Sequence, residues 1–251
     1  LAIFNGGNAL ATVVAAPLGS YLGSTIGWRG AFLCLVPVAI VAFIWQYFSL
    51  PNMGGNQRPS PRKSVFRLLH QPAVSVGLMA CGLFFMGQFA LFTYVRPFLE
   101  TVTHVSPSGL SLILLTIGIA GFIGTLIVAL VLNAAFYLTL MAIPLLMALI
   151  AGVLMLTGDS LWIVALLLGF WGMLATAAPT GWWTWIARTL PEDAEAGGGL
   201  MVAVIQLSIA LGSTAGGVVF DTFGWQSTFA LSSILLLSAG VLTFTTSRHR
   251  K

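Results

Sequence analysis

Long apolar runs recur along the whole chain and leave few choices for its fold. Of the 251 residues, 58% are hydrophobic and only 6% are charged, which is too little charge to cover the surface of a water-soluble domain. A helix of about twenty apolar residues is long enough to cross the hydrocarbon core of a bilayer. The sequence therefore predicts an all-α integral membrane protein. Its eight predicted transmembrane helices cover residues 3–25, 31–49, 73–95, 108–131, 137–157, 161–187, 199–220 and 225–246.

The fourth and fifth of these helices need a turn between them. No charged residue lies between His104 and Asp159, and one unbroken helix of that length would extend far beyond a bilayer. Asn133 is the polar break in the right place, so we expect the chain to turn there.

Positive charges are distributed unevenly over the predicted loops. Eight of the ten Lys and Arg residues lie in the 50–72 loop, after the sixth helix or in the C-terminal tail, and only Arg29 and Arg96 lie on the other side. Because basic residues are retained on the cytoplasmic side, this bias predicts a cytoplasmic C-terminus in a bacterial-type plasma (inner) membrane. The net charge of +4 is an orientation signal that also favours anionic lipid headgroups, and we expect no nucleic-acid partner.

The start of the sequence is unusual, because Leu1 and the residues after it already read as a membrane span. We expect the chain to be part of a longer protein. A cleavable signal peptide is not expected, since no charged segment or cleavage site precedes the apolar run. Cys34 and Cys81 both lie in predicted helices, where we expect apolar packing residues and no disulfide.

An internal repeat organises the chain. Aligning "GSYLGSTIGWRGAF" with "GGVVFDTFGWQSTF" pairs Gly19 with Gly216, Gly27-Trp28 with Gly224-Trp225, and Phe32 with Phe229. The first predicted helix thus corresponds to the seventh, and the second to the eighth. The last six helices form a complete unit, and the earlier copy keeps its last two. We therefore expect an intact protein of twelve spans in two parallel halves, of which this chain holds spans 5–12.

The domain boundaries follow from this repeat. The expected parts are the last two spans of the N-terminal half (1–49), a basic cytoplasmic central loop (50–72), the C-terminal six-helix half (73–247) and a cytoplasmic tail (248–251).

Several segments resemble a known transporter family. Pro17-Leu18-Gly19 followed by Gly27-Trp28-Arg29 resembles the fifth-span motif of proton-coupled drug and metabolite efflux pumps of the major facilitator superfamily. Further segments resemble its branch of purine ribonucleoside and sugar efflux proteins: "GQFALFTYVRPFLE" (87–100), "APTGWWTWIARTLPEDAEAGG" (178–198) and "VAVIQLSIALGSTAGGVVFD" (202–221). One difference is "LNAAFY" (132–137), which lacks the basic residues that such proteins carry after the eighth span. The resemblance implies a twelve-span major facilitator fold that exports a solute in exchange for protons.

The glycines of the first helix favour a close helix contact. Gly19 and Gly23 are four residues apart and share a helix face, where the missing side chains let a neighbouring backbone approach. Pro17 removes a backbone donor and bends the helix. Together with Gly212 and Gly216 of the seventh helix, these residues are predicted to form a conformational seam that closes the transport path on one side. Plain helix packing is the alternative.

Polar side chains mark the predicted solute path, because such groups are costly where they face lipid. Two stripes of residues spaced by four, one in the sixth helix and one in the third, end in Arg188 and Arg96. The amide of Gln206 lies near the midplane of the seventh helix. Hydrogen bonds to the same or a neighbouring helix are the alternative for each residue. The predicted cavity residues are Gln88, Phe92, Thr176, Thr180, Thr184 and Gln206.

Aromatic and basic residues near helix ends have two interpretations. Trp182, Trp183 and Trp185 could stack on a base, but their position near the inner interface equally fits an aromatic belt or packing. Arg29 and Arg96 fit snorkelling charges at span ends.

The sequence contains no pattern typical of an enzyme or a metal site. The three histidines are isolated, no Cys or His cluster has metal-ligand spacing, and no glycine-rich phosphate loop with its lysine occurs. We expect no enzymatic activity, no cofactor and no metal. All six acidic residues lie at predicted span ends, so the resemblance to antiporters implies a coupling acid in the upstream spans.

These observations predict a secondary active transporter that exports a small organic solute, such as a purine nucleoside, a sugar or a drug, by proton antiport. Its expected partners are the solute, protons and the lipid bilayer, and we expect a monomer. Uptake by the same fold stays open, because direction depends on the coupling gradient. A membrane-embedded enzyme and a channel also stay open, although the parallel repeat argues against a simple pore.

Overall fold

Helices account for nearly all of the described chain. The computed structural model describes residues 11, 14–15, 17–19, 21–49 and 65–248, and all regular elements within them are helical, which confirms the predicted all-α class. The elements are α2 (Gly27–Leu33), α3 (Leu35–Ser49), the 3₁₀ helix η1 (Val65–His70), α4 (Pro72–Phe92), α5 (Val95–Thr101), α6 (Pro107–Ala134), α7 (Phe136–Thr157), α8 (Leu161–Thr189), α9 (Ala194–Phe223) and α10 (Trp225–Arg248).

Seven stretches of the described residues are long and apolar enough to cross a membrane. They correspond to the second through eighth predicted spans, the first of them running over α2 and α3 from Gly27 to Ser49. The predicted span 3–25 and the loop residues 50–64 lie mostly or wholly outside the described residues.

The predicted turn between the fourth and fifth spans is confirmed. Helix α6 ends at Ala134 and α7 begins at Phe136, with Ala135 alone between them in a non-helical conformation. Asn133 itself belongs to the last turn of α6, so the break comes two residues later than the polar residue that predicts it.

Two helix boundaries differ from the sequence prediction. Helix α9 begins at Ala194 instead of residue 199, because its glycine run is helical and Gly197 is buried against Leu190. The third span does not end at residue 95, since the chain breaks only at Thr93 and Tyr94 and continues as α5. Pro97 explains the break, because it has no N–H to donate to the carbonyl of Thr93.

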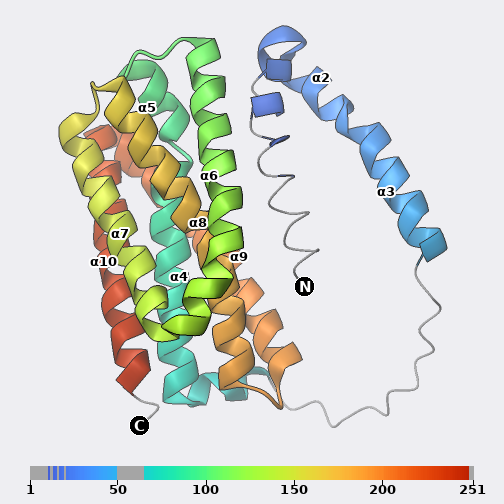
Figure 1. Cartoon of the computed structure of the whole chain (residues 1–251), viewed down its shortest axis with the longest axis vertical. Helices are drawn as coiled ribbons and strands as arrows, with labels where there is room; N and C mark the ends of the chain where they lie inside the picture. The colour runs from blue at the N-terminus through green and yellow to red at the C-terminus, as the bar shows by residue number, and fades with distance from the viewer. Residues whose placement is uncertain (1–10, 12–13, 16, 20, 50–64, 249–251) are drawn as a thin grey trace.

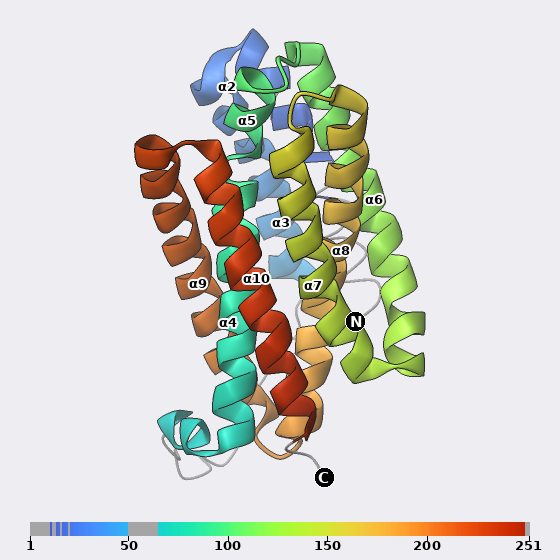
Figure 2. The same ribbon diagram turned by 90° about the vertical axis from the view of Figure 1, so that its left-hand side faces the viewer.

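Six helices, α4 and α6 to α10, pack into one bundle. The largest contacts are α4 with α9 and α10, α6 with α8, and α7 with α8 and α10. Figure 2 shows that the start of α4, the α6–α7 turn, the end of α8 and the C-terminus lie toward one end of the bundle, whereas α5 and the α7–α8 and α9–α10 turns lie at the other. Trp171, Trp182, Trp185 and Phe84 are fully buried in the core of this bundle.

The internal repeat has a structural counterpart. Gly27 and Gly224, which the repeat aligns, have φ of 75° and 84° and are the glycines with positive φ among the described residues. Each is followed directly by a tryptophan in a new helix, Trp28 in α2 and Trp225 in α10. Glycine populates this left-handed region at no steric cost, so both copies use the same turn between consecutive spans.

Helices α2 and α3 contrast with the bundle. Every residue of α3 is exposed, including Phe43, Trp45 and Phe48, and Figure 1 shows α2 and α3 standing apart from the six helices. Large apolar side chains exposed along a whole helix are expected where lipid or other helices cover them.

Candidate functional site

Helices α4 and α9 approach each other closely at the predicted glycine seam. A Cβ added at Gly212 would collide with the carbonyl oxygen of Met86, and one at Gly216 would lie 2.5 Å from the carbonyl oxygen of Ala90. Gly217 likewise leaves room for the hydroxyl of Tyr94. Since an added methyl group would meet backbone at two successive turns, only glycine fits this face of α9.

Polar groups also join α4 and α9 at the end of this contact that lies next to α5. The Tyr94 hydroxyl donates to the carbonyl of Ser213 at 2.9 Å, and the Thr93 and Ser213 hydroxyls lie 3.0 Å apart. The Tyr94 ring stacks on Phe220, with centroids 5.3 Å apart. The break between α4 and α5 is therefore attached directly to α9.

A second glycine seam joins α6 to α8, and it was not predicted from the sequence. A Cβ at Gly124 would collide with the carbonyl of Met173, and one at Gly172 would lie 2.5 Å from the carbonyl oxygen of Ile117. Gly121 lies against the side chain of Thr176. The available signal was the spacing of three between glycines in "GIAGFIG" (118–124), which places them near one helix face.

The upstream members of the predicted seam contact no other helix in the described part of this chain. Gly19 is exposed and Gly23 half-buried, and a Cβ added at either would meet nothing within 4 Å. Pro17 is half-buried. The structure thus brings Gly212 and Gly216 into a tight interface and leaves Pro17, Gly19 and Gly23 away from one.

The threonine stripe of α8 is engaged largely with backbone. Thr176 Oγ1 lies 2.9 Å from the carbonyl oxygen of Gly121 and 2.6 Å from that of Gly172, so its single O–H is shared between these two acceptors. The Thr184 hydroxyl donates to the carbonyl of Thr180 at 2.7 Å. The contact with Gly121 of another helix favours the packing interpretation for Thr176. All three threonines are half-buried and keep some exposed surface.

The remaining predicted cavity residues differ widely in exposure. Gln88 is only 8% exposed, inside the bundle. Phe92, the last residue of α4, is half-buried and packs edge-on against Phe89. Gln206 is exposed on α9. Among the six residues, exposed surface therefore remains on all but Gln88: Phe92, Thr176, Thr180, Thr184 and Gln206.

The tryptophan cluster of α8 is split between core and surface. Trp182 and Trp185 are buried and pack edge to face, with ring centroids 5.9 Å apart, whereas Trp183 is 44% exposed. Arg188 lies over the ring of Phe136 at 4.4 Å and so places a positive charge beside the α6–α7 turn. These contacts favour the packing and belt interpretation over base stacking.

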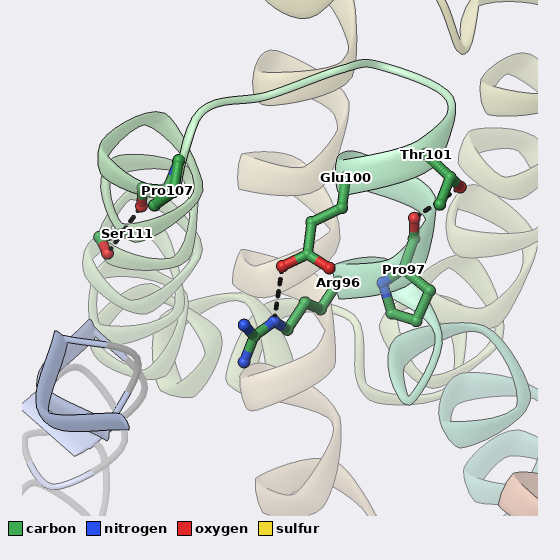
Figure 3. Close-up of polar contacts among 6 residues, drawn as sticks. All are labelled: Arg96, Pro97, Glu100, Thr101, Pro107 and Ser111. Carbon is green, nitrogen blue, oxygen red and sulfur yellow. Dashed lines mark hydrogen bonds and ion pairs between the residues drawn. The ribbon is translucent and has the colours of Figure 1, made fainter. Parts of the chain in front are cut away.

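The predicted outer end carries a surface ion pair. In Figure 3, Arg96 reaches Glu100 one turn further along α5, with 2.9 Å between Arg96 Nε and Glu100 Oε1, and both side chains are exposed. Arg29 lies over the ring of Trp28 at 4.9 Å. An exposed pair of this kind adds little stability, and it fits charges that extend from a span end toward water.

Acidic groups lie outside the middle of the helices. Glu100 ends α5, Asp159 lies in the α7–α8 turn, and Asp221 lies in the last turn of α9. Glu192, Asp193 and Glu195 lie at the start of α9. Among the described residues, no group of three His, Cys, Asp or Glu is placed to hold a metal ion.

Comparison with known proteins yields a transcription regulatory protein and several efflux pumps. The chain is 62% identical to the transcription regulatory protein OpdE of Pseudomonas aeruginosa over 253 residues, which cover 100% of this chain and 63% of that protein. It is 41% identical to the purine ribonucleoside efflux pump NepI of Salmonella enteritidis and of Salmonella typhimurium over 238 residues, which cover 94% of this chain and 59% of each pump. The chain thus spans about three fifths of the length of these relatives.

The family follows from a broader match. The model of the Major Facilitator Superfamily matches residues 1–201, and the apolar helices and paired small-residue contacts of the structure agree with it. This chain belongs to the major facilitator superfamily of membrane transporters.

Proposed function

We propose that the full-length protein exports a small organic solute, a purine nucleoside or a similar flat polar molecule, in exchange for protons. The observation that carries this proposal is the 41% identity to purine ribonucleoside efflux pumps across 94% of the chain. The six-helix bundle supports it, because a parallel half of this kind can rock against a second half around a midplane site.

The proposed solute site lies on the α8 and α9 surfaces that keep polar groups exposed. Thr180 and Thr184 of α8, Gln206 of α9 and the ring of Phe92 offer hydroxyls, an amide and an aromatic face. Such a set suits a flat, neutral, hydrogen-bonding solute. Gln88 lies inside the bundle, and the half-buried Thr176 links α8 to α6 through the Gly121 carbonyl, so both order the helices that carry this surface.

Proton coupling requires a titratable group that is exposed alternately to the two sides of the membrane. All six acids of this chain lie at helix ends or in turns, so we assign the coupling acid to the part of the full-length transporter that its relatives carry in addition. Accordingly, the 251-residue chain expressed alone should confer no transport.

The transport assay uses the full-length protein in everted membrane vesicles that are loaded with protons by respiration. A radiolabelled purine ribonucleoside should accumulate in these vesicles, and an uncoupler should abolish the accumulation. Accumulation that persists with the uncoupler would rule out proton antiport, and accumulation only in right-side-out vesicles would indicate uptake.

The site assignment is tested by cysteines placed at positions 180, 184 and 206 of the full-length protein. They should react with small water-soluble thiol reagents, and bound nucleoside should slow the reaction. Leu207, adjacent to Gln206 and 62% exposed, is the matched control. A cysteine there should react little, because a lipid-facing thiol does not ionise. Equal reactivity at 206 and 207 would place Gln206 outside the solute path.

Replacement of Gln206 by leucine keeps the side-chain volume and removes the amide. We expect solute binding to weaken by about 1 to 3 kcal/mol, the scale of an unpaired polar partner, with normal insertion into the membrane. Unchanged apparent affinity in Gln206→Leu would identify Gln206 as a packing residue.

The proposed orientation puts the basic 50–72 loop and the C-terminus in the cytoplasm of an inner membrane. A common side is supported by the fold, because the start of α4 with the preceding η1, the end of α8 and the C-terminal end of α10 lie toward the same end of the bundle (Figure 2). Arg67 belongs to η1 and Arg188 to the last turn of α8. Single cysteines at Asn56 and in the tail should resist impermeant thiol reagents in intact cells. Labelling of both from outside would reverse the orientation.

A second candidate function is regulatory, and the printed name of the 62% identical relative favours it. Under this alternative, a transport-inactive variant restores the wild-type transcript pattern in a strain that lacks the gene. Under the transport proposal, only variants that move solute restore the wild-type transcript pattern.

A further inference from the structure

Two polar side-chain atoms in the bundle interior have no hydrogen-bond partner among the described residues. They are Oε1 of Gln88 on α4 and Nε1 of Trp171 on α8. Gln88 is 8% exposed and Trp171 is completely buried. Buried polar atoms in folded proteins are almost always paired with protein or ordered water, so the two atoms together require a physical explanation.

The two residues point into the same part of the bundle. Gly77 of α4 lies directly against the indole ring of Trp185 of α8, which fixes one contact between the facing sides of these helices. Gln88 is eleven residues after Gly77, or about 20° from the same face at 100° per residue. Trp171 is fourteen residues before Trp185, or about 40° from the same face.

The two residues also lie at nearly the same depth. Helices α4 and α8 run in opposite directions, so the residue of α8 level with Gln88 is eleven positions before Trp185, at position 174. Trp171 is three positions further, about 4.5 Å along the axis at 1.5 Å per residue. An indole side chain is long enough to cover that distance.

A second chain of contacts gives the same depth. The Ser232 hydroxyl of α10 donates to the carbonyl of Gly87 at 2.7 Å, and its neighbour Ser233 donates to the carbonyl of Ala148 of α7 at 3.0 Å. Two turns earlier in α7, Leu140 lies against Gly181 of α8. Helices α7 and α8 run in opposite directions, so moving up α7 from Leu140 to Ala148 corresponds to moving back along α8 from Gly181 to position 173. Gln88 is therefore again level with the turn of α8 that carries Trp171.

The chemistry of the two atoms is complementary to one small molecule. Gln88 Oε1 accepts a hydrogen bond and Trp171 Nε1–H donates one, so their common ligand must donate and accept. Because Trp171 has no exposed surface, nothing much larger than water reaches it while the helices are packed. The buried side chains of α7 at this depth are the small Ala148 and Ala151 and the larger Met147 and Ile150.

We propose that one water molecule bridges Gln88 Oε1 and Trp171 Nε1 in the middle of the six-helix bundle. It donates to the amide oxygen and accepts from the indole N–H, and so it connects α4 and α8 at a depth where the structure shows no direct polar contact between them. A buried water with such partners is costly to remove and acts as part of the structure. The proposal does not depend on the solute or on proton coupling.

The test is nuclear magnetic resonance of the whole chain in lipid nanodiscs, with ¹⁵N-labelled tryptophan indoles. The Trp171 signal is identified by its disappearance in Trp171→Phe. In the wild type it should show cross-relaxation with water and the shift of a hydrogen-bonded N–H. Gln88→Leu should abolish the water signal at Trp171 and leave the indole of Trp182, also buried on α8, unchanged.

Leu91→Met is the matched control, because it alters the buried face of α4 one turn away and leaves both polar atoms in place. It should preserve the water signal. Three results would overturn the proposal: no water contact at Trp171 in the wild type, a water contact that survives Gln88→Leu, or an indole shift that depends on Gln88 without any water contact, which would indicate a direct bond. The first needs only the assignment by Trp171→Phe, so it stands even if Gln88→Leu fails to fold.

Discussion

The glycine shared by the two copies of the repeat, Gly19 and Gly216, has opposite surroundings in the two copies. Gly19 and Gly216 occupy equivalent positions in the repeat, yet a methyl group at Gly19 would meet open space, whereas one at Gly216 would lie 2.5 Å from a carbonyl oxygen of α4. The two glycines differ because a neighbouring helix, α4, faces Gly216 and none of the described residues faces Gly19. A small-residue face permits a close helix contact, and the presence of a partner helix determines whether it makes one.

The largest expected effect comes from filling the occupied seam. Gly212→Ala drives a Cβ into the carbonyl of Met86, and because backbone cannot rotate away, α4 and α9 must separate. We expect a loss of about 1 to 3 kcal/mol, the usual cost of overpacking, measured as a lower thermal unfolding midpoint of the chain in nanodiscs. An unchanged midpoint would mean that α4 and α9 can move apart at this point without loss of stability.

A smaller effect is expected at the second seam. Gly121→Ala places a Cβ 2.7 Å from Thr176 Oγ1, which is a side-chain atom that can turn away at the cost of its bond to the Gly121 carbonyl. We expect a loss of about 1 kcal/mol, the worth of one such hydrogen bond. The double variant Gly121→Ala with Thr176→Ala should recover part of that loss, because both γ atoms of Thr176, the hydroxyl included, are then removed together with the clash. No recovery would mean that the backbone, and not Thr176, sets the spacing of α6 and α8.

Removing one hydrogen bond between α4 and α9 should reduce stability less than a glycine substitution that clashes with backbone. Tyr94→Phe keeps the stacking on Phe220 and deletes the hydroxyl that donates to the Ser213 carbonyl. We expect a loss of about 0.5 to 1.5 kcal/mol by the same thermal measurement. Tyr21→Phe, at a 62% exposed tyrosine of the other copy, is the control and should leave the midpoint unchanged.

The smallest effect is expected at the unoccupied copy. Gly19→Ala should leave the unfolding midpoint of this chain unchanged or slightly raised, because alanine stabilises a helix where it meets no neighbour. The same substitution in the full-length transporter should lower the midpoint as Gly212→Ala does here, if the first copy packs as the second does. If Gly19→Ala leaves the unfolding midpoint unchanged in this chain and in the full-length transporter, the first copy of the repeat does not pack as the second does.

Much of the fold could be predicted from local patterns. Runs of apolar residues predicted the spans from 31 to 246, Asn133 predicted the α6–α7 turn to within two residues, and the repeat predicted that Gly27 and Gly224 are equivalent, which their positive φ values support. These features depend on neighbours in sequence. The predicted start of the seventh span at residue 199 was five residues too late, because the glycines before it stay helical where a neighbouring helix covers them. The third span was predicted to within three residues of the end of α4 at Phe92, but its continuation as α5 after the break at Thr93 and Tyr94 was not predicted.

The candidate site was less predictable than the fold. Spacing by four placed Thr176, Thr180 and Thr184 on one helix face, but it did not show that Thr176 would bond to the Gly121 carbonyl of another helix. It equally did not separate buried Gln88 from exposed Gln206. Periodicity gives a direction around a helix axis and does not identify the neighbour in that direction.

The sequence by itself therefore determined that this protein is helical, membrane-embedded and built from a repeated unit, because burial in lipid and helix hydrogen bonding act on each segment separately. Only the tertiary structure decided which glycines form seams, which threonines pack and which polar atoms meet in the bundle interior. Lipid is as apolar as most side chains, so helix pairing depends on shape and on a few hydrogen bonds between distant residues, and those are properties of assembled helices that no single segment carries.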